Sequence, residues 1–280
     1  MSISLPTYSR LELPLLGRRE RVRAIIATGL RREFRRPAAI VVIAIGVAFT
    51  TITSIVLVLF ASFLLPGQPL NLSFFALPAS NGFVLFFVSL MAAIIGSGLI
   101  ADDLHSMAFT LYLSRPITHL DYLLAKAAIL APLVSMITVL PLVITALIAA
   151  LLFPLVFSWG VALQAVGLSV AVGLLLAFFN TSVALFLSSL TRRKGLAAAG
   201  MFGGNFGLFI PASILASAIG NPNLLYLSPW NDYLAVATAA FGAPGIGIDW
   251  PGALAILLGV TVLAALVTYL RMRAVEVITG

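Results

Sequence analysis

Cysteine is absent from this chain of 280 residues, and charged residues make up only 9% of it. Without cysteine there can be no disulfide, no thiolate metal site and no cysteine nucleophile. The scarcity of charge excludes more, because a soluble globular domain carries roughly 25% charged residues. A chain that is 61% hydrophobic cannot cover its surface with polar groups. This composition is typical of an integral membrane protein.

Long uncharged runs separate the few charged residues, and each run is a candidate membrane span. A helix needs roughly 20 apolar residues to cross about 30 Å of hydrocarbon. The first run begins after Pro37 and is too long for the core of a cleavable signal peptide, so we expect it to be retained. We predict an all-α, polytopic membrane protein in which residues 38–280 form a domain of six transmembrane helices. The predicted spans are approximately residues 38–65, 82–100, 122–153, 161–190, 196–219 and 252–270.

The distribution of basic residues orients these spans. Nine arginines precede the first span, and the other seven Lys and Arg residues belong to two loops, after spans two and four, and to the C-terminal tail. The loops 66–81, 154–160 and 220–251 contain none. Because positively charged loops stay in the cytoplasm, we expect both termini there and the chain in the inner membrane of a prokaryotic cell. The net charge of +7 then indicates topology and contact with anionic membrane lipids, not with nucleic acid.

Two segments outside the spans have helical patterns. In residues 1–37, apolar side chains from Val22 to Phe34 recur at helical spacing and most arginines fall on the other side, which predicts an amphipathic helix on the membrane surface. The alternative is a solvated leader that only sets orientation. In the long loop before span six, Asp232 to Phe241 could form a short helix that folds back onto the outer leaflet, and a floppy connector is the alternative.

No active site is evident in the sequence. We find no ionisable residue well inside a predicted span, which argues against ion-coupled carriers and intramembrane metalloproteases. Neither Lys126 nor Lys194 follows a glycine-rich phosphate-binding loop, so we expect no ATP hydrolysis by this chain through that route. Polar side chains within spans four and five have two interpretations, hydrogen bonds between helices or the lining of a substrate path. The candidates for the lining are Asn180, Ser182 and Asn205.

The loop between spans two and three has the most informative pattern. Ser106 could cap a short helix that runs to about Leu113, and Pro116 would end it. Thr118 and Asp121 have the spacing of a capping box at the start of the next helix. The apolar side chains of this loop are too many for a solvated connector, so we predict an ordered cytoplasmic structure suited to docking against another protein.

This loop resembles a segment of the permease subunits of ABC type-2 exporters. Those proteins have an acidic residue at the end of the second span, a short coupling helix, and a stretch similar to LYLSRPITHLDYLLAK, which here runs from Leu111 to Lys126. This chain departs from the pattern at Ala125, where a glycine is usual, and at Met107–Ala108, which replaces a glycine-containing pair. The layout of six spans with a basic N-terminal helix is also similar.

The resemblance implies a permease subunit that forms the substrate path and works with a separate ATP-binding-cassette subunit. That partner would bind ATP and Mg²⁺, while this chain would bind no cofactor and no metal and would not be an enzyme. Two permease chains, identical or different, would share the path. The partner would dock on the coupling helix and on the loop between spans four and five. The residues implied at this interface are Asp103, Leu104, Met107, Leu111, Tyr112, Arg115, Pro116, Arg192 and Arg193.

Two other functions remain open at this point. A stand-alone secondary carrier or channel would work without an ATPase and usually has an internal repeat, of which we see no convincing sign. A membrane enzyme could use a metal held by acidic and histidine side chains of the same loop. Those side chains are Asp102, Asp103, His105 and His119.

Overall fold

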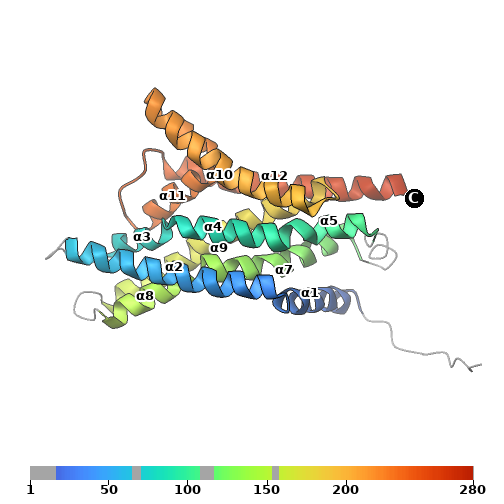
Figure 1. Cartoon of the computed structure of the whole chain (residues 1–280), viewed down its shortest axis with the longest axis horizontal. Coiled ribbons are helices and arrows are strands. Elements are labelled where there is room, and N and C mark those ends of the chain that lie inside the picture. Colours follow the sequence, from blue (N-terminus) through green and yellow to red (C-terminus); the bar gives the residue numbers. More distant parts are fainter. Residues whose placement is uncertain (1–16, 65–70, 108–116, 153–157, 280) are drawn as a thin grey trace, which may run out of the picture.

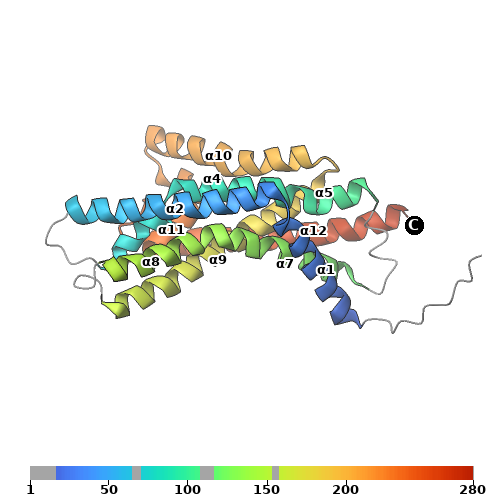
Figure 2. The same cartoon turned by 60° about the horizontal axis from the view of Figure 1, so that its bottom comes forward.

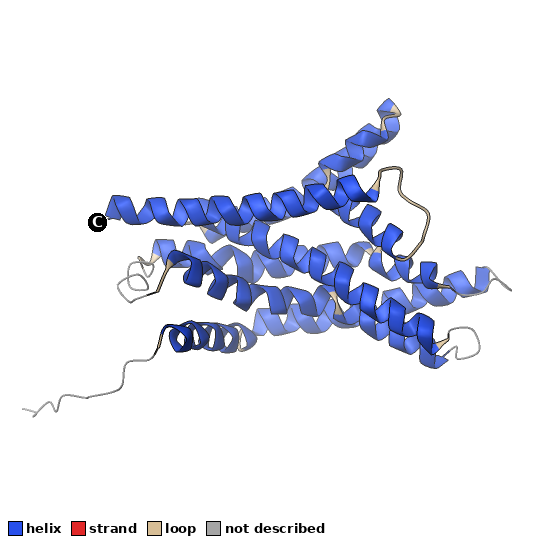
Figure 3. Cartoon of the chain, turned by 180° about the vertical axis from the view of Figure 1, so that it is seen from behind, coloured by secondary structure: helices blue, strands red, loops and turns tan. Residues whose placement is uncertain are grey.

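The computed structural model describes residues 17–64, 71–107, 117–152 and 158–279. Within these ranges the secondary structure is helical, without strands (Figure 3). The helices are α1 (Arg18–Phe34), α2 (Pro37–Leu64), η1 (Leu72–Phe75), α3 (Ala76–Ala79), α4 (Gly82–Met91), η2 (Ala92–Gly96), α5 (Ser97–His105), α7 (His119–Thr138), α8 (Leu140–Leu152), α9 (Trp159–Leu190), α10 (Lys194–Ile219), η3 (Pro222–Leu227), α11 (Pro229–Ala240) and α12 (Trp250–Thr279).

Six helical stretches in the described part of the chain are long and apolar enough to cross a membrane, which confirms the prediction of a six-helix, all-α membrane protein. The second stretch joins α4, η2 and α5 and continues to His105, beyond the predicted end at residue 100. The third joins α7 and α8, between which Val139 lies outside both helices. The six stretches are Pro37–Phe60, Gly82–His105, His119–Leu152, Trp159–Leu190, Lys194–Ile219 and Trp250–Ala274.

The spans run side by side along the long axis of the molecule (Figure 1). At one end lie α1, the end of α5, the start of α7, the turn between α9 and α10, and the end of α12. Every Lys and Arg of the described residues belongs to these segments or to the junction of α1 with α2, so we call this the basic end. The centre of the bundle is α9, which packs against α5, α7, α8, α10, α11 and α12.

The helix α1 leaves the bundle at a steep angle at the basic end (Figure 2). Its apolar side chains, including Val22, Ile26 and Leu30, are half-buried, and α1 packs on α7. The contact is close at Gly29, where an added Cβ would lie 2.2 Å from Cδ1 of Ile129. The sequence therefore predicted the helix and its apolar side, and part of that side covers α7.

The second span is irregular where it meets the centre of the bundle. Residues Ala92–Gly96 form a π-helical turn, and a Cβ at Gly96 would lie 2.7 Å from Cβ of Ala184 in α9. Beyond this turn, the backbone N–H groups of Ile100 and Ala101 donate to Oγ of Ser188 at 3.0 and 2.9 Å. The same hydroxyl donates to the carbonyl of Ser97 at 2.7 Å. Ser188 thus fixes α5 to α9 through backbone groups.

The long segment before the last span contains the predicted helix, α11, and it is largely buried. It packs against α12, α9, α10 and α3, and Trp230 and Tyr233 stack with ring centroids 5.1 Å apart. This part of the segment is therefore an ordered helix, and the alternative prediction of a floppy connector is wrong for it. The carboxylate of Asp232 is buried, and neither oxygen has a hydrogen-bond partner within the described ranges. Burial raises the pKa of Asp232 to about 7.

The pH dependence of stability tests this carboxyl. A carboxyl with a pKa near 3.8 in the unfolded chain and about 7 in the folded chain keeps its proton only in the folded state between those values. The contribution of Asp232 to stability is therefore complete below about pH 4 and is lost as the pH rises to about 7. We expect the Tm of the purified protein to fall between about pH 5 and about pH 8, and Asp232→Asn to reduce this fall.

The matched control is Asp249→Asn, at an exposed carboxyl of the same segment that accepts a hydrogen bond from the hydroxyl of Tyr226. The pKa of Asp249 is lowered by that bond, so this variant should keep the wild-type slope between about pH 5 and about pH 8. An unchanged slope in Asp232→Asn would show that the carboxyl is not the titrating group.

Candidate functional site

The predicted docking segment is bounded by two ordered helix ends. On its N-terminal side α5 ends at His105, Ser106 is the C-cap, and its hydroxyl donates to the carbonyl of Asp102 at 2.7 Å. Met107 follows with a left-handed φ of 56°. Ser106 therefore ends a helix, and the prediction that it begins one is wrong because α5 extends further than the apolar run. Residues 108–116, with the predicted coupling helix and Leu111, Tyr112, Arg115 and Pro116, lie outside the described residues.

On the C-terminal side of this segment the predicted capping box is present. The hydroxyl of Thr118 accepts the backbone N–H of Asp121 at 3.2 Å, and the carboxylate of Asp121 accepts the N–H of Thr118 at 3.1 Å. The guanidinium of Arg18 in α1 donates to both carboxylate oxygens of Asp121, at 2.8 and 3.0 Å. Two bonds to one carboxylate fix the geometry of a pair better than one. The start of α7 is thus held to the start of α1.

A buried ion pair joins the ends of the second and third spans. Nζ of Lys126 lies 2.7 Å from Oδ2 of Asp103, with only 4% and 14% of the two side chains exposed. The hydroxyl of Tyr122 donates to the same oxygen at 2.7 Å, and the ammonium also lies 5.3 Å from the ring centroid of Tyr122. Assigning Lys126 to a loop was therefore wrong, since it lies two turns inside α7 and its side chain faces α5. The aspartate stabilises the ammonium in a place where water does not reach it.

A second buried acid lies at the junction of α1 and α2. The side chain of Glu33 is fully buried, and it accepts hydrogen bonds from Arg32 at 2.9 Å and Arg36 at 2.8 Å. The negative charge of Glu33 also interacts electrostatically with the ammonium of Lys126. The sequence reasoning missed Glu33 because it lies among arginines that all appeared to face solvent. Its position one residue before Phe34, next to the apolar side of α1, was the available signal.

The predicted interface residues occupy different surroundings. Asp103 and Leu104 face inward, with Leu104 only 9% exposed, and Met107 is exposed at the end of α5. Arg192 and Arg193 are exposed in the short turn between α9 and α10. The described residues of both predicted docking segments therefore lie at the basic end (Figure 1). Asp103 is paired with Lys126 inside the bundle, and its predicted role at the docking interface stays a prediction.

Two of the three polar candidates for the substrate path, Asn180 and Asn205, form a buried cluster with Ser89. The amide of Asn205 in α10 donates to Oγ of Ser89 at 2.6 Å and to Oδ1 of Asn180 at 3.2 Å. Asn180 in turn donates to the carbonyl of Leu176 at 2.9 Å, while Ser182 is half-buried. Within one chain, Asn180 and Asn205 thus make hydrogen bonds that join α4, α9 and α10. Of the two interpretations of the sequence, this is hydrogen bonding between helices.

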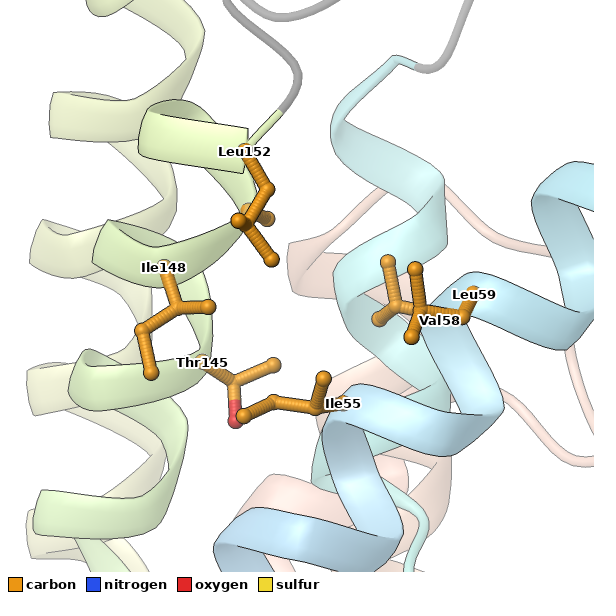
Figure 4. A pocket seen from close by; sticks show the side chains of 7 residues that line it. Ile55, Val58, Leu59, Thr145, Ile148 and Leu152 are labelled. Carbon is orange, nitrogen blue, oxygen red and sulfur yellow. The ribbon is translucent and has the colours of Figure 1, made fainter.

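One small hollow between the helices has almost no polar lining. A crevice between α2 and α8, far from the basic end, has a volume of only about 10 Å³ (Figure 4). The single polar group among its lining residues, the hydroxyl of Thr145, donates to the carbonyl of Pro141 at 2.7 Å. The described residues also contain no group of three or more His, Asp or Glu placed to hold a metal ion. The suggested site of Asp102, Asp103, His105 and His119 is thus not assembled there.

The fold and the six apolar helical stretches define a polytopic helical membrane protein. The chain belongs to the ABC-2 transporter family, since the sequence pattern described as ABC-2 family transporter protein matches residues 39–276. The family consists of membrane-spanning permease components of ABC transporters that are not themselves catalytic. Membership implies an ATPase partner and a dimeric arrangement in general. No curated protein matches the chain.

The buried ion pair can be tested by a cycle of substitutions. Asp103→Asn keeps an acceptor for Tyr122 but leaves the buried ammonium of Lys126 without its countercharge. Removing one partner of a buried pair costs about 3–5 kcal/mol, whereas removing both is often nearly neutral. We expect Asp103→Asn to lower the Tm in detergent clearly, and Asp103→Asn/Lys126→Met to restore most of the loss.

Asp102→Asn is the matched control for this cycle, because Asp102 is the exposed neighbour of Asp103 on the same helix. An exposed substitution is expected to change stability by less than about 0.5 kcal/mol. If the double variant were as unstable as Asp103→Asn, the aspartate would be needed for more than the charge of Lys126.

Proposed function

We propose that this chain is the permease subunit of an ABC exporter, with the basic end in the cytoplasm as the surface that receives a separate ATPase subunit. The observation that carries the proposal is the buried Asp103–Lys126 pair, which joins the ends of the second and third spans beside the predicted coupling helix. Both termini are then cytoplasmic, in agreement with the absence of Lys and Arg from the loops on the opposite side.

Two ion pairs, Asp103–Lys126 and Arg18–Asp121, explain how a movement of the partner would reach the membrane spans. The predicted coupling helix would lie between α5, which ends at His105, and α7, which begins at His119. Because Lys126 binds Asp103 and Arg18 binds Asp121, a force on the segment moves α5, α7 and α1 together. Ser188 extends the unit to α9. Packed helices with fixed contacts move as rigid bodies, which is the form that subunit switching commonly takes.

The short turn between α9 and α10 provides a second proposed contact. Its exposed Arg192 and Arg193 fit an acidic surface of the partner, where opposite charges set register and association rate. ATP and Mg²⁺ act on the partner, and this chain changes conformation because the partner has unequal affinity for its two states. A second permease chain completes the substrate path. The bonds of Asn205 to Ser89 and Asn180 would have to exchange if α10 moved to open it.

The experiment is a pull-down of the tagged chain in mild detergent from its native membranes, with mass spectrometry of the proteins retained. We expect an ATP-binding-cassette protein in stoichiometric amount. Leu111→Glu and Arg115→Glu should weaken its retention at least about tenfold, which corresponds to ~1.4 kcal/mol at an interface. Arg273→Glu reverses an exposed charge at the same end of the molecule and should leave retention unchanged.

Two results would contradict the proposed function or the proposed docking site. A chain that purifies without an ATPase and still moves solute into liposomes lacking ATP would be a secondary carrier, and the proposal would fail. Loss of the partner in Arg273→Glu to the same extent as in Arg115→Glu would show a general effect of charge and not a docking site.

A further inference from the structure

A groove of about 290 Å³ lies between α10 and α12, and its floor is formed by the last turns of α9, with Phe186 and Leu187. One wall is formed by Gly200 and Gly204 of α10, and the other includes Val260 and Val267 of α12. No polar side chain lines it. A site for a solute normally has a few polar groups that fix the orientation of its ligand, so these walls suit a plain hydrocarbon chain.

A cation lies where this groove reaches the basic end. Arg271 follows Val267 by four residues, so it lies on the same face of α12 as the groove wall. Its Nη2 donates to the carbonyl of Leu190 at 3.0 Å, at the C-terminal end of the groove floor, and its side chain is exposed. On the facing wall, Arg193 lies seven residues before Gly200, and it is the N-cap of α10 without a side-chain cap. An uncapped helix N-terminus adds to the positive potential at this point.

The length of the groove matches one leaflet of a bilayer. Val260 and Arg271 are eleven residues apart on α12, which is about 16 Å at a rise of 1.5 Å per residue. Half of the hydrocarbon core is about 15 Å. An apolar chain in the groove would therefore extend from the middle of the membrane to the level of Arg271, where lipid phosphates lie.

We infer that this groove binds one acyl chain of an anionic phospholipid of the cytoplasmic leaflet, with its phosphate at Arg271 and the start of α10. Basic pockets between membrane helices on the cytoplasmic side are suited to such headgroups. The inference takes the cytoplasmic position of the basic end from the proposed function. The site lies away from the Asp103–Lys126 pair and does not require an ATPase partner, so lipid binding and partner binding can fail separately. Arg193 belongs to both proposals, and the test therefore uses Arg271.

Charge favours a lipid over a second copy of the chain in this groove. A second copy seated on this groove about a two-fold axis along the membrane normal would bring its own Arg271 and Arg193 beside these, so the second permease chain of the proposed function uses another face. Both arginines are exposed. Like charges at the mouth of the groove would repel, whereas a phospholipid phosphate would neutralise Arg271.

The test uses the full chain, purified in mild detergent and depleted of lipid, then mixed with micelles that contain phosphatidylglycerol or phosphatidylcholine. Native mass spectrometry counts the lipids that each chain retains. We expect one phosphatidylglycerol, retained in preference to phosphatidylcholine. Arg271→Gln should weaken phosphatidylglycerol binding about fivefold, the effect of one basic residue at a membrane surface. Arg273→Gln, at an exposed arginine two residues further along α12, should not.

A second pair of variants tests the groove itself. No atom lies within 4 Å of a Cβ added at Gly204 or at Gly203, so a Cβ at either position lies in open space. Gly204→Leu fills the groove and should abolish retention of both lipids, and Gly203→Leu, outside the groove, should leave it unchanged. Size-exclusion mass and Tm show that each variant is folded.

Three results would overturn the inference. Equal retention of the two lipids by the wild type would remove the role of charge. Unchanged retention in Gly204→Leu would place the lipid elsewhere. A change of oligomeric mass in Gly204→Leu, with lipid retention as in the wild type, would show that the groove is a contact between chains.

Discussion

No water is available inside a bilayer to satisfy a peptide group, and this constraint decides most of the structure. Every backbone N–H and C=O at that depth needs a partner within the protein, which leaves the helix as the economical solution for a chain of this composition. The departures from regular helix are therefore informative. The π-helical turn at Ala92–Gly96 lies next to the backbone groups that Ser188 binds, so a side chain of α9 completes the hydrogen bonding of the second span. The same contact orients that span.

The cost of burying charge explains the arrangement of the basic end. Asp103 and Lys126 lie together, so that each buried charge is balanced by the other, and Glu33 is enclosed by two arginines. Such pairs add little net stability compared with apolar side chains, but they accept few alternative arrangements. Their position around the predicted docking segment is consistent with a part of the molecule that must move without losing its internal geometry.

The sequence predicted what depends on long runs and on spacing. Six apolar runs indicated six spans, and Thr118 with Asp121 indicated the start of α7, because a capping box depends only on neighbouring residues. The end of α5 could not be predicted from neighbouring residues. Asp102 and Asp103 appeared to end the span, yet the helix continues because Lys126, 23 residues further along the chain, neutralises the charge of Asp103.

The candidate site was predictable only in part for the same reason. Side chains such as Asp103, Glu33 and Asn205 have partners on other helices, and nothing in the local sequence states which helix will lie alongside. The resemblance located the segment between the second and third spans, but it did not distinguish the surface from its support. Asp232 is a further case, since its burial depends on how α11 packs between α12, α9 and α10.

The segregation of charge along the bundle has an electrical consequence. Among the side chains that the structure describes, all fourteen Lys and Arg and five of the seven acids lie at the basic end, so its formal charge is +9, while Asp232 and Asp249 give the other side −2. The molecule is thus a large dipole across the membrane. A voltage that is negative on the basic side holds it in this orientation, at about 2.3 kcal/mol per elementary charge per 100 mV. Any step of a working cycle that moved α1 and its arginines through the membrane surface would also transfer charge, and its rate would then depend on voltage.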